Sequence, residues 1–425
     1  MTSSSNSPRI HPAWVVLVAV TLCMMASSGL RSVFGVYIKP LEAEFGWTRG
    51  ALSGVAAISL LLLGAAGPFA GRLADRWGPR RVIVLSLTML GGGAIGAAAV
   101  HALWQLYVTT GVLMGIGSAG LGMATGAVIA TRWFEARRGL AIGIVAGGMS
   151  AGQLVIIPLA AMLMLWFGWR VSLFWLGLGV LAIVVPLALW LVRNDPLDRG
   201  LRPYGSTGPA LTAAQTVEAR RAGRVGIIEA AKYPQFWLLM STFFVCGYTT
   251  NGMVLTHFMP HALDHGFTEL QASTALGVMG AMNMLGTIAS GWFCDRFGRR
   301  GPLATYYFLR GVSLIFLVYV WNAPSLHLWA AIYGLNYIST LPPTTSLTAS
   351  IFGRYSVGEL SGWIFFAHQV GAALGAAIAG WVFDFYGSYT PAFISAGLLG
   401  LLAAALTMLI REESVIARPL EPAPA

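Results

Sequence analysis

The chain has 425 residues, of which 56% are hydrophobic and only 10% are charged, and its formal net charge is +10. A water-soluble fold could not bury so much apolar surface, because soluble domains are roughly 45 to 50% apolar. The arginines lie in short segments between apolar runs and form no continuous basic patch, which argues against a nucleic-acid-binding protein.

Apolar stretches recur from Trp14 to Ile410. At roughly 20 residues each, they are long enough to cross a hydrocarbon core about 30 Å thick as helices. We predict an all-α membrane protein with twelve transmembrane helices in two six-helix bundles. The bundles are predicted at residues 1–192 and at residues 235–425, the second ending in a short cytoplasmic tail. Residues 193–234 contain prolines, glycines and arginines but no run able to span lipid, so they are predicted to form a cytoplasmic linker.

Basic residues gather in the loops after the second, fourth, sixth and eighth predicted helices. Because such residues accumulate on the cytoplasmic side, we expect these loops and both termini in the cytoplasm. The apolar run that begins at Trp14 is too long for the core of a signal peptide and is predicted to be a retained helix. Lys39 and Lys232 are the only lysines among 26 basic residues, a bias typical of GC-rich bacteria, so we expect a cell inner membrane.

One loop motif occurs twice. Residues 71–81 (GRLADRWGPRR) follow the second predicted helix, and residues 291–300 (GWFCDRFGRR) follow the eighth. Glycine, aspartate, arginine, glycine and arginine match at a constant offset of 220 residues. The two halves are therefore predicted to share one structural plan.

The paired loop resembles the signature of the major facilitator superfamily, and the resemblance covers nearly the whole chain. It implies two six-helix bundles around a central cavity and transport by rocking of one half against the other. In the loops, glycines let helices approach closely, and the aspartates can pair with arginines or with the positive N-terminus of a facing helix. For the arginines alone, plain topology-setting charge is the alternative. We expect a conformational latch made of Asp75, Arg76, Arg80, Asp295, Arg296 and Arg300.

A narrower resemblance lies in residues 32–47 (SVFGVYIKPLEAEFGW), residues 133–143 (WFEARRGLAIG) and residues 168–170 (GWR). These stretches resemble the monocarboxylate porter and oxalate–formate antiporter branch. The resemblance implies a small organic anion as the solute, carried by proton symport or by anion exchange. Many monocarboxylate porters have an aspartate and, four residues later, an arginine in the eighth helix, where this chain has Asn283 and Thr287. The coupling mechanism of that family therefore cannot be transferred.

Ionisable groups inside lipid cost roughly 2.5 to 3.5 kcal/mol at a helix centre and therefore usually face a cavity. Within the predicted helices these groups are arginines and histidines, whereas the carboxylates fall at loops or helix ends. A positive centre attracts anions. Arg31 is the first candidate for the counter-charge of the substrate, because a guanidinium binds a carboxylate bidentately. The alternative is that Arg31 extends to the outer interface. Arg310 is expected to bond to carbonyls or to a tyrosine such as Tyr306.

Other candidates are polar or titratable. His257 and His368 could carry protons, because the unperturbed pKa of histidine is about 6.5, although a helical histidine is often merely hydrogen-bonded. The tenth predicted helix presents polar side chains at three- and four-residue steps, which form one stripe, and Pro342 and Pro343 could bend it. The stripe could instead only join helices. The predicted substrate-binding set comprises Arg31, Asn251, His257, Asn283, Tyr333, Asn336, Tyr337, His368 and Gln369.

No nucleotide-binding loop, metal-ligand cluster or nucleophile with its base is recognisable, so we predict neither an enzyme nor a cofactor or metal. The expected partners are membrane lipid, a small organic anion and protons, with the chain acting as a monomer. One alternative is a proton-coupled exporter of drugs or other solutes, which normally needs a carboxylate inside the membrane. A more distant alternative is a non-transporting membrane receptor.

Overall fold

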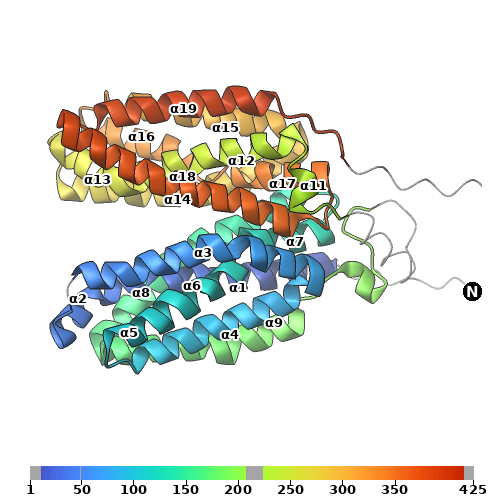
Figure 1. Cartoon of the computed structure of the whole chain (residues 1–425), viewed down its shortest axis with the longest axis horizontal. Coiled ribbons are helices and arrows are strands. Elements are labelled where there is room, and N and C mark those ends of the chain that lie inside the picture. The colour runs from blue at the N-terminus through green and yellow to red at the C-terminus, as the bar shows by residue number, and fades with distance from the viewer. Residues whose placement is uncertain (1–10, 48, 207–223, 416–425) are drawn as a thin grey trace, which may run out of the picture.

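The computed structural model describes residues 11–47, 49–206 and 224–415, and this part of the chain is almost entirely helical (Figure 1). Nine of its helical segments are long and apolar enough to cross a membrane, with mean hydropathy from 1.2 to 2.4. Lipid offers no hydrogen-bond partner to a peptide group, so such segments fold as helices, which satisfy their own backbone.

The first half of the chain forms one bundle of helices. Its longest element, α8, contains a break at Gly168, where φ is 82° and ψ is 164°. Only glycine adopts this conformation readily, and it lets the chain turn back on itself. The elements are α1 (Pro12–Ser32), α2 (Phe34–Phe45), α3 (Arg49–Trp77), α4 (Pro79–Ala98), α5 (Leu103–Leu106), η1 (Tyr107–Leu113), α6 (Met114–Gly120), α7 (Met123–Trp133), α8 (Arg138–Gly179), η2 (Val180–Val184) and α9 (Val185–Leu191).

The second half forms a bundle of the same kind. Its elements are α12 (Pro234–Gly247), η4 (Tyr248–Val254), α13 (Leu255–Asp264), α14 (Glu269–Phe297), α15 (Arg300–Leu317), α16 (Ala323–Asn336), α17 (Leu341–Phe352), α18 (Val357–Tyr386) and α19 (Thr390–Met408), preceded by η3 (Pro196–Arg199) and α11 (Ile227–Ala230). Residues 207–223 of the predicted linker lie outside the described residues. The sequence predicted one helix over 326–352. The structure breaks it at residues 337–340, just before the two prolines at which a bend was expected.

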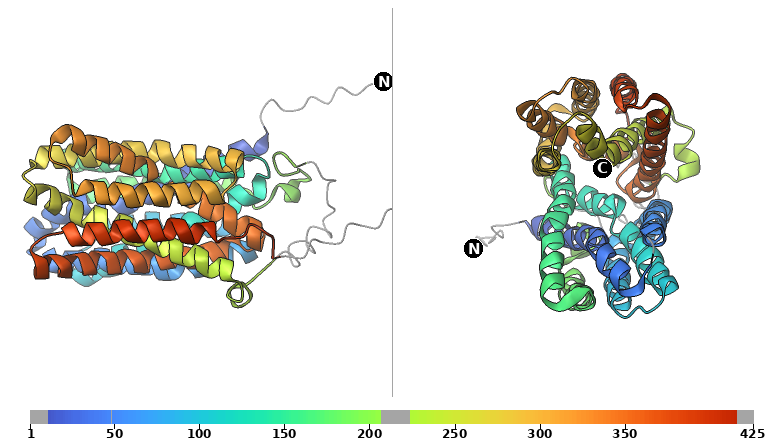
Figure 2. Two further views of the ribbon diagram at one scale, coloured as in Figure 1. Left: turned by 90° about the horizontal axis from the view of Figure 1, so that it is seen from above. Right: turned by 90° about the vertical axis from the view of Figure 1, so that its left-hand side faces the viewer.

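The two bundles lie side by side with their long axes parallel, as the end-on view in Figure 2 shows. They meet most extensively along two helix pairs, α3 with α18 and α8 with α14, and α7 and α17 add further contacts. We call these pairs the first seam and the second seam. Each bundle has its own apolar core, and large side chains such as Leu165, Trp190 and Phe385 stay exposed on the outside. These outer faces suit lipid, because in water so much exposed apolar surface would drive association.

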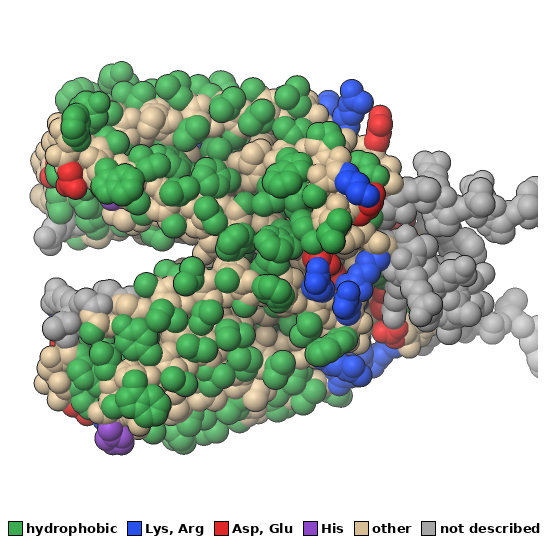
Figure 3. Space-filling model, in the orientation of Figure 1, with side chains coloured by type: hydrophobic (Ala, Val, Ile, Leu, Met, Phe, Trp, Pro, Cys, Tyr) green, Lys and Arg blue, Asp and Glu red, His purple; other side chains and the backbone are tan. Residues whose placement is uncertain are grey.

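The space-filling view shows a cleft between the bundles at one end and close contact at the other (Figure 3). We call the closed end, where η3, α11 and most of the Lys and Arg side chains in this view lie, the linker end. We call the other end, where α2, α5 and α13 lie, the open end. The cleft between the bundles therefore opens at the open end, and contacts between the bundles close it at the linker end.

Candidate functional site

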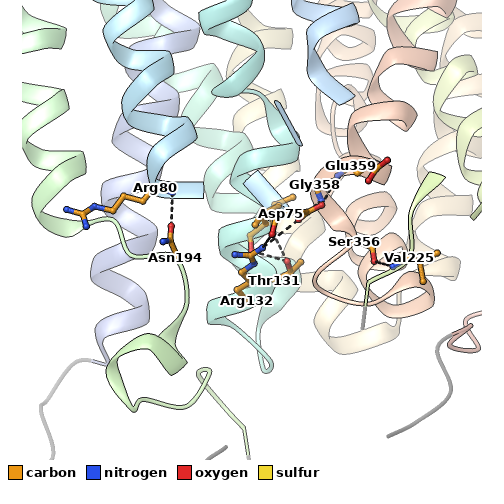
Figure 4. Close-up of polar contacts among 11 residues, drawn as sticks. Asp75, Arg80, Thr131, Arg132, Asn194, Val225, Ser356, Gly358 and Glu359 are labelled. Carbon is orange, nitrogen blue, oxygen red and sulfur yellow. Dashed lines mark hydrogen bonds and ion pairs between the residues drawn. The ribbon is translucent and has the colours of Figure 1, made fainter. Parts of the chain in front are cut away.

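The first seam is closed at the linker end by a carboxylate that caps a helix (Figure 4). Asp75, near the end of α3, accepts hydrogen bonds from the backbone N–H groups of Gly358 (3.3 Å) and Glu359 (2.9 Å). These groups belong to the first turn of α18, where N–H groups have no partner within the helix and the dipole is positive. Nη2 of Arg132 lies 3.7 Å from Oδ1 of Asp75, and the side chain of Asp75 is fully buried.

The second seam repeats this contact with the halves exchanged. Asp295, near the end of α14, accepts hydrogen bonds from the backbone N–H groups of Gly139 (2.7 Å) and Leu140 (2.8 Å). These groups form the first turn of α8. Asp295 is exposed to solvent, whereas Asp75 is enclosed, so the two carboxylates make the same contact in different surroundings.

Glycines bring the backbones of each seam into direct contact. A Cβ on Gly71 would come within 2.0 Å of the carbonyl oxygen of Gly358, and a Cβ on Gly291 would come within 2.2 Å of that of Gly139. Real side chains never tolerate such distances, so both positions require glycine while the linker end is closed. The repeated motif thus supplies the close approach as well as the carboxylate.

The first seam has a contact that the second seam lacks. Arg72 donates to the Glu359 carboxylate at 2.5 Å, forming an ion pair between α3 and α18. The equivalent of Arg72 at an offset of 220 residues is Trp292, and the residue after Gly139 is Leu140 rather than an acid. The first seam therefore contains an ion pair where the second seam has apolar side chains.

Three of the four predicted latch arginines make contacts within their own halves. The backbone N–H of Arg80 donates to Asn194 Oδ1 at 3.0 Å, and that of Arg300 donates to Glu412 Oε1 at 3.0 Å. The guanidinium of Arg296 lies 5.7 Å from the centre of the Trp292 ring on its own helix. The last of the four, Arg76, is exposed.

Arg31 lies in the last turn of α1, where its side chain is partly buried. The exposed, lipid-facing side of α1 is marked by Val18 and Leu22, which are 56% and 41% exposed. At about 100° per residue, nine residues place Arg31 opposite Leu22 on the helix, toward the protein interior. One turn earlier, Ser28 accepts a hydrogen bond from Gln153 Nε2 on α8 at 3.1 Å. Over the described ranges of the chain, Arg31 has neither an ion-pair nor a hydrogen-bond partner.

Asn283 joins the two halves deeper in the second seam. Its Nδ2 donates to Ser150 Oγ on α8 at 3.2 Å, and its Oδ1 accepts from the backbone N–H of Ile338 at 3.2 Å. Ile338 lies in the break between α16 and α17. Asn283 is therefore engaged on both sides of its amide and is nearly buried.

Arg310 on α15 also forms hydrogen bonds at the break between α16 and α17. It is completely buried in the second bundle, and its Nη2 donates to the carbonyl oxygens of Asn336 (2.5 Å) and Tyr337 (2.7 Å). These carbonyls end α16 and have no helical partner. The expectation that Arg310 bonds to carbonyls matches this geometry, although the tyrosine ring beneath it is Tyr307, at 5.5 Å, rather than Tyr306.

The polar residues predicted on the tenth helix, Tyr333, Asn336 and Tyr337, all make hydrogen bonds inside the second bundle. Tyr333 is fully buried, and its hydroxyl donates to the carbonyl oxygen of Thr249 at 2.8 Å. Tyr337 donates to Asn251 Oδ1 at 2.9 Å, which pairs two of the predicted residues. Asn336 Nδ2 donates to the carbonyl oxygen of Ile332 at 2.8 Å. The two tyrosine contacts hold α16 and the residue after it against η4, whereas the Asn336 contact lies within α16.

The two histidines lie in separate places within the second bundle. His257 Nε2 is 2.9 Å from the carbonyl oxygen of Ala376 on α18, so its ring joins α13 to that helix. His368 is 8% exposed and lies against the rings of Phe243 and Phe365. Its Nδ1 is 3.1 Å from Oε1 of Gln369.

Sequence reasoning missed the residues that face the two aspartates. A second repeat marks them: Gly139 and Gly143 in the first half correspond to Gly358 and Gly362 in the second, at an offset of 219 residues. Comparison of the two halves beyond the loop motif would have found these glycines. Glu359 has no counterpart in the other half, so its pairing with Arg72 could come only from the structure.

The family model of the Major Facilitator Superfamily matches residues 20–376 and 264–424 of this chain. Monocarboxylate transporter 11 of Mus musculus is 28% identical over 90% of this chain and 83% of its own. The uncharacterized MFS-type transporter YcxA of Bacillus subtilis is 27% identical, over 90% of this chain and 91% of its own.

Two solved structures share the fold of this chain. The proton:xylose symporter XylE superposes with a TM-score of 0.71 at 15% identity, covering 95% of this chain and 97% of that one. The transporter FucP superposes with a TM-score of 0.69 at 15% identity, covering 94% of this chain and 100% of that one. The match of the family model over most of the sequence, together with the two-bundle fold, shows that this chain belongs to the major facilitator superfamily and is a multi-pass membrane transporter rather than an enzyme.

Proposed function

We propose that the chain is a secondary carrier of a small organic anion, in particular a monocarboxylate, which binds in the cleft between the two bundles. The observation that carries the proposal is Arg31. Its guanidinium lies on the interior side of α1 and, within the described part of the chain, has no partner. A positive charge removed from water is costly unless an anion joins it, and a substrate carboxylate can be that anion.

The second arginine inside the membrane does not compete for this role. Arg310 has its Nη2 occupied by two carbonyl oxygens and its Nη1 by a sulfur within the second bundle. One available guanidinium favours a solute with one carboxylate. The relatives named as monocarboxylate transporters support the same class of solute.

Alternating access follows from the two seams. While the linker end is closed, Asp75 and Asp295 each cap a helix of the opposite bundle, and the glycine pairs hold the backbones together. Release of both caps would let the linker end open and the open end close around the bound solute. Basic loops at the linker end favour an orientation with that end in the cytoplasm of the cell and the protein in the inner membrane. The carrier would then take its solute through this cycle by proton symport or by anion exchange.

The test is uptake into proteoliposomes of labelled lactate, pyruvate, formate and oxalate, with and without an imposed pH gradient. We expect uptake of at least one monocarboxylate, reduced about 10- to 100-fold in Arg31→Ala, because a hydrogen bond to a charged group contributes about 1.5–3 kcal/mol. Arg31→Lys should retain part of the activity, and Arg411→Ala, at an exposed position of the linker end, should retain all of it.

Two results would overturn the proposal. One is carboxylate uptake in a folded Arg31→Ala protein equal to that of the unaltered chain. The other is efflux of organic cations driven by the pH gradient with no carboxylate transport, which would support the exporter alternative. Melting temperatures of both Arg31 variants establish that they fold.

A further inference from the structure

The second bundle holds a group of polar side chains that neither the latch nor Arg31 involves. Arg310 on α15 is completely buried, and its Nη1 donates to the sulfur of Cys246 on α12 at 3.0 Å. Thr340 Oγ1 lies 3.2 Å from the same sulfur. The thiol therefore lies where a cationic donor and a hydroxyl converge on it.

The charge of Arg310 needs an anion. Carbonyl oxygens orient the guanidinium but cannot neutralise it, and an uncompensated buried charge is strongly unfavourable. Among the described residues, no carboxylate lies within ion-pair distance of Arg310. Of the atoms to which Arg310 donates, the sulfur of Cys246 alone belongs to a side chain that can ionise.

A histidine lies on the helix packed against α12. Gly247, next to Cys246, lets α18 approach closely, since a Cβ there would come within 1.8 Å of the His368 carbonyl oxygen. The amide oxygen of Gln369 faces Nδ1 of His368 at 3.1 Å. Because that oxygen accepts, the neutral ring carries its proton on Nδ1 and keeps a lone pair on Nε2.

We infer that the thiolate of Cys246 is the counter-ion of Arg310 and that Cys246 is a site of reversible protonation. When the S–H bond breaks, the proton passes to water, which leaves a thiolate beside the guanidinium, and the reverse step restores the thiol. No oxidant and no covalent partner takes part. Cys246 would supply the proton site that the eighth helix lacks, where Asn283 stands.

Several other ionisable side chains surround the sulfur of Cys246. Most of them are tyrosines, which add no charge in their neutral form. The titratable and charged groups around Cys246 are Arg310 and Tyr307 from α15, Tyr333 and Tyr337 from α16, and His368 from α18. Arg310 is thus the one permanent charge in this cluster.

The ionic state of Cys246 can be measured without any substrate. In the Cys23→Ala/Cys294→Ala protein, Cys246 is the one remaining thiol of the chain. We expect its infrared spectrum at neutral pH to lack the S–H stretching band, and the band to appear on acidification and in the further variant Arg310→Gln. A full S–H band at neutral pH in the folded protein, absent in Cys246→Ser, would overturn the inference.

The proton-coupling role rests on the proposed function and is tested separately, with labelled lactate. Cys246→Ser should lower uptake driven by a pH gradient at least about tenfold, while lactate exchange without a gradient stays within about twofold. Cys246→Asp, which restores an ionisable group, should recover part of the gradient-driven uptake. Unchanged gradient-driven uptake in Cys246→Ser would exclude the role. If the unaltered chain carries no lactate, pyruvate, formate or oxalate, the proposed function fails, while the infrared result still decides the charge pair.

Discussion

Asp295 caps the first turn of α8 in the same way as Asp75 caps the first turn of α18. Each carboxylate accepts hydrogen bonds from two backbone N–H groups of the opposite bundle. Both contacts cross between the halves, so opening of the linker end has to break both. Hydrogen bonds to a charged acceptor are stronger than neutral ones, and a helix N-terminus adds its positive dipole. The two aspartates therefore hold one conformation of the carrier.

Asp75→Asn should shift the conformational equilibrium toward an open linker end. The variant keeps the shape of the side chain but loses its charge, which costs the closed state about 1–3 kcal/mol and changes the population about 5- to 150-fold. The measurement is the distance distribution between spin labels at positions 76 and 296, whose arginines are exposed at the linker end of the two bundles.

Asp295→Asn should act in the same direction but more weakly, because its carboxylate is exposed and solvent screens it. Asp264→Asn, on an exposed residue of α13, serves as the control. Equal distance distributions in Asp75→Asn and the unaltered chain would contradict the role of the capping carboxylates.

Gly291→Ala should prevent the linker end from closing fully. The added methyl group would meet the Gly139 carbonyl oxygen at 2.2 Å, and that atom belongs to a helix backbone that cannot move aside. We expect transport to fall at least about tenfold, since overpacking costs typically 1–3 kcal/mol. Gly280→Ala is the matched control on the same helix, because a Cβ there meets nothing within 4 Å. Equal transport by the two variants would argue against closure through the glycine pair.

Arg310→Gln should destabilise the protein strongly, by about 3–5 kcal/mol, because carbonyl groups at the end of α16 lose their donor inside the bundle. The readout is the melting temperature in detergent. Arg296→Gln, at an exposed position of α14, should stay within about 0.5 kcal/mol of the unaltered chain. A melting temperature for Arg310→Gln that matches this control would show that the break does not depend on the guanidinium.

Gly168→Ala tests backbone strain in isolation. A Cβ at this position meets no atom within 4 Å, but φ is 82°, so the expected loss of about 1–3 kcal/mol comes from conformation alone. Gly179→Ala on the same helix has helical dihedrals and equally open space, and should be neutral. The comparison of their melting temperatures is the measurement. A melting temperature of Gly168→Ala equal to that of Gly179→Ala would mean that the chain turns back without strain there.

The fold could be predicted largely from the sequence, because lipid forces long apolar segments to be helical. The duplicated loop then indicated how the two halves correspond. The break at residues 337–340 was not predicted at its position. It depends on Asn283, Ser290 and Arg310, which come from other helices and satisfy the backbone that the break exposes.

The candidate site could be predicted only in part. Asp75 and Asp295 could be identified because the motif repeats. Their hydrogen-bond donors are backbone N–H groups, which every residue except proline has, so the side chains opposite them do not reveal the contact. The arginines next to them in the motif looked equivalent, yet Arg80 bonds to Asn194 and Leu189 of its own half. Contacts such as Cys246 with Arg310 join residues 64 positions apart on helices with no shared pattern, so only the packed structure brings them together.

The Arg72–Glu359 ion pair has a consequence for how ionic strength acts on the carrier. Salt screens a partly exposed ion pair but leaves apolar contacts intact or strengthens them. The side chain of Arg72 is 40% exposed, and its counterpart Trp292 offers nothing to screen. Raising the salt concentration should therefore weaken an ion pair between α3 and α18 that α8 and α14 do not have, so that the two seams respond unequally to ionic strength.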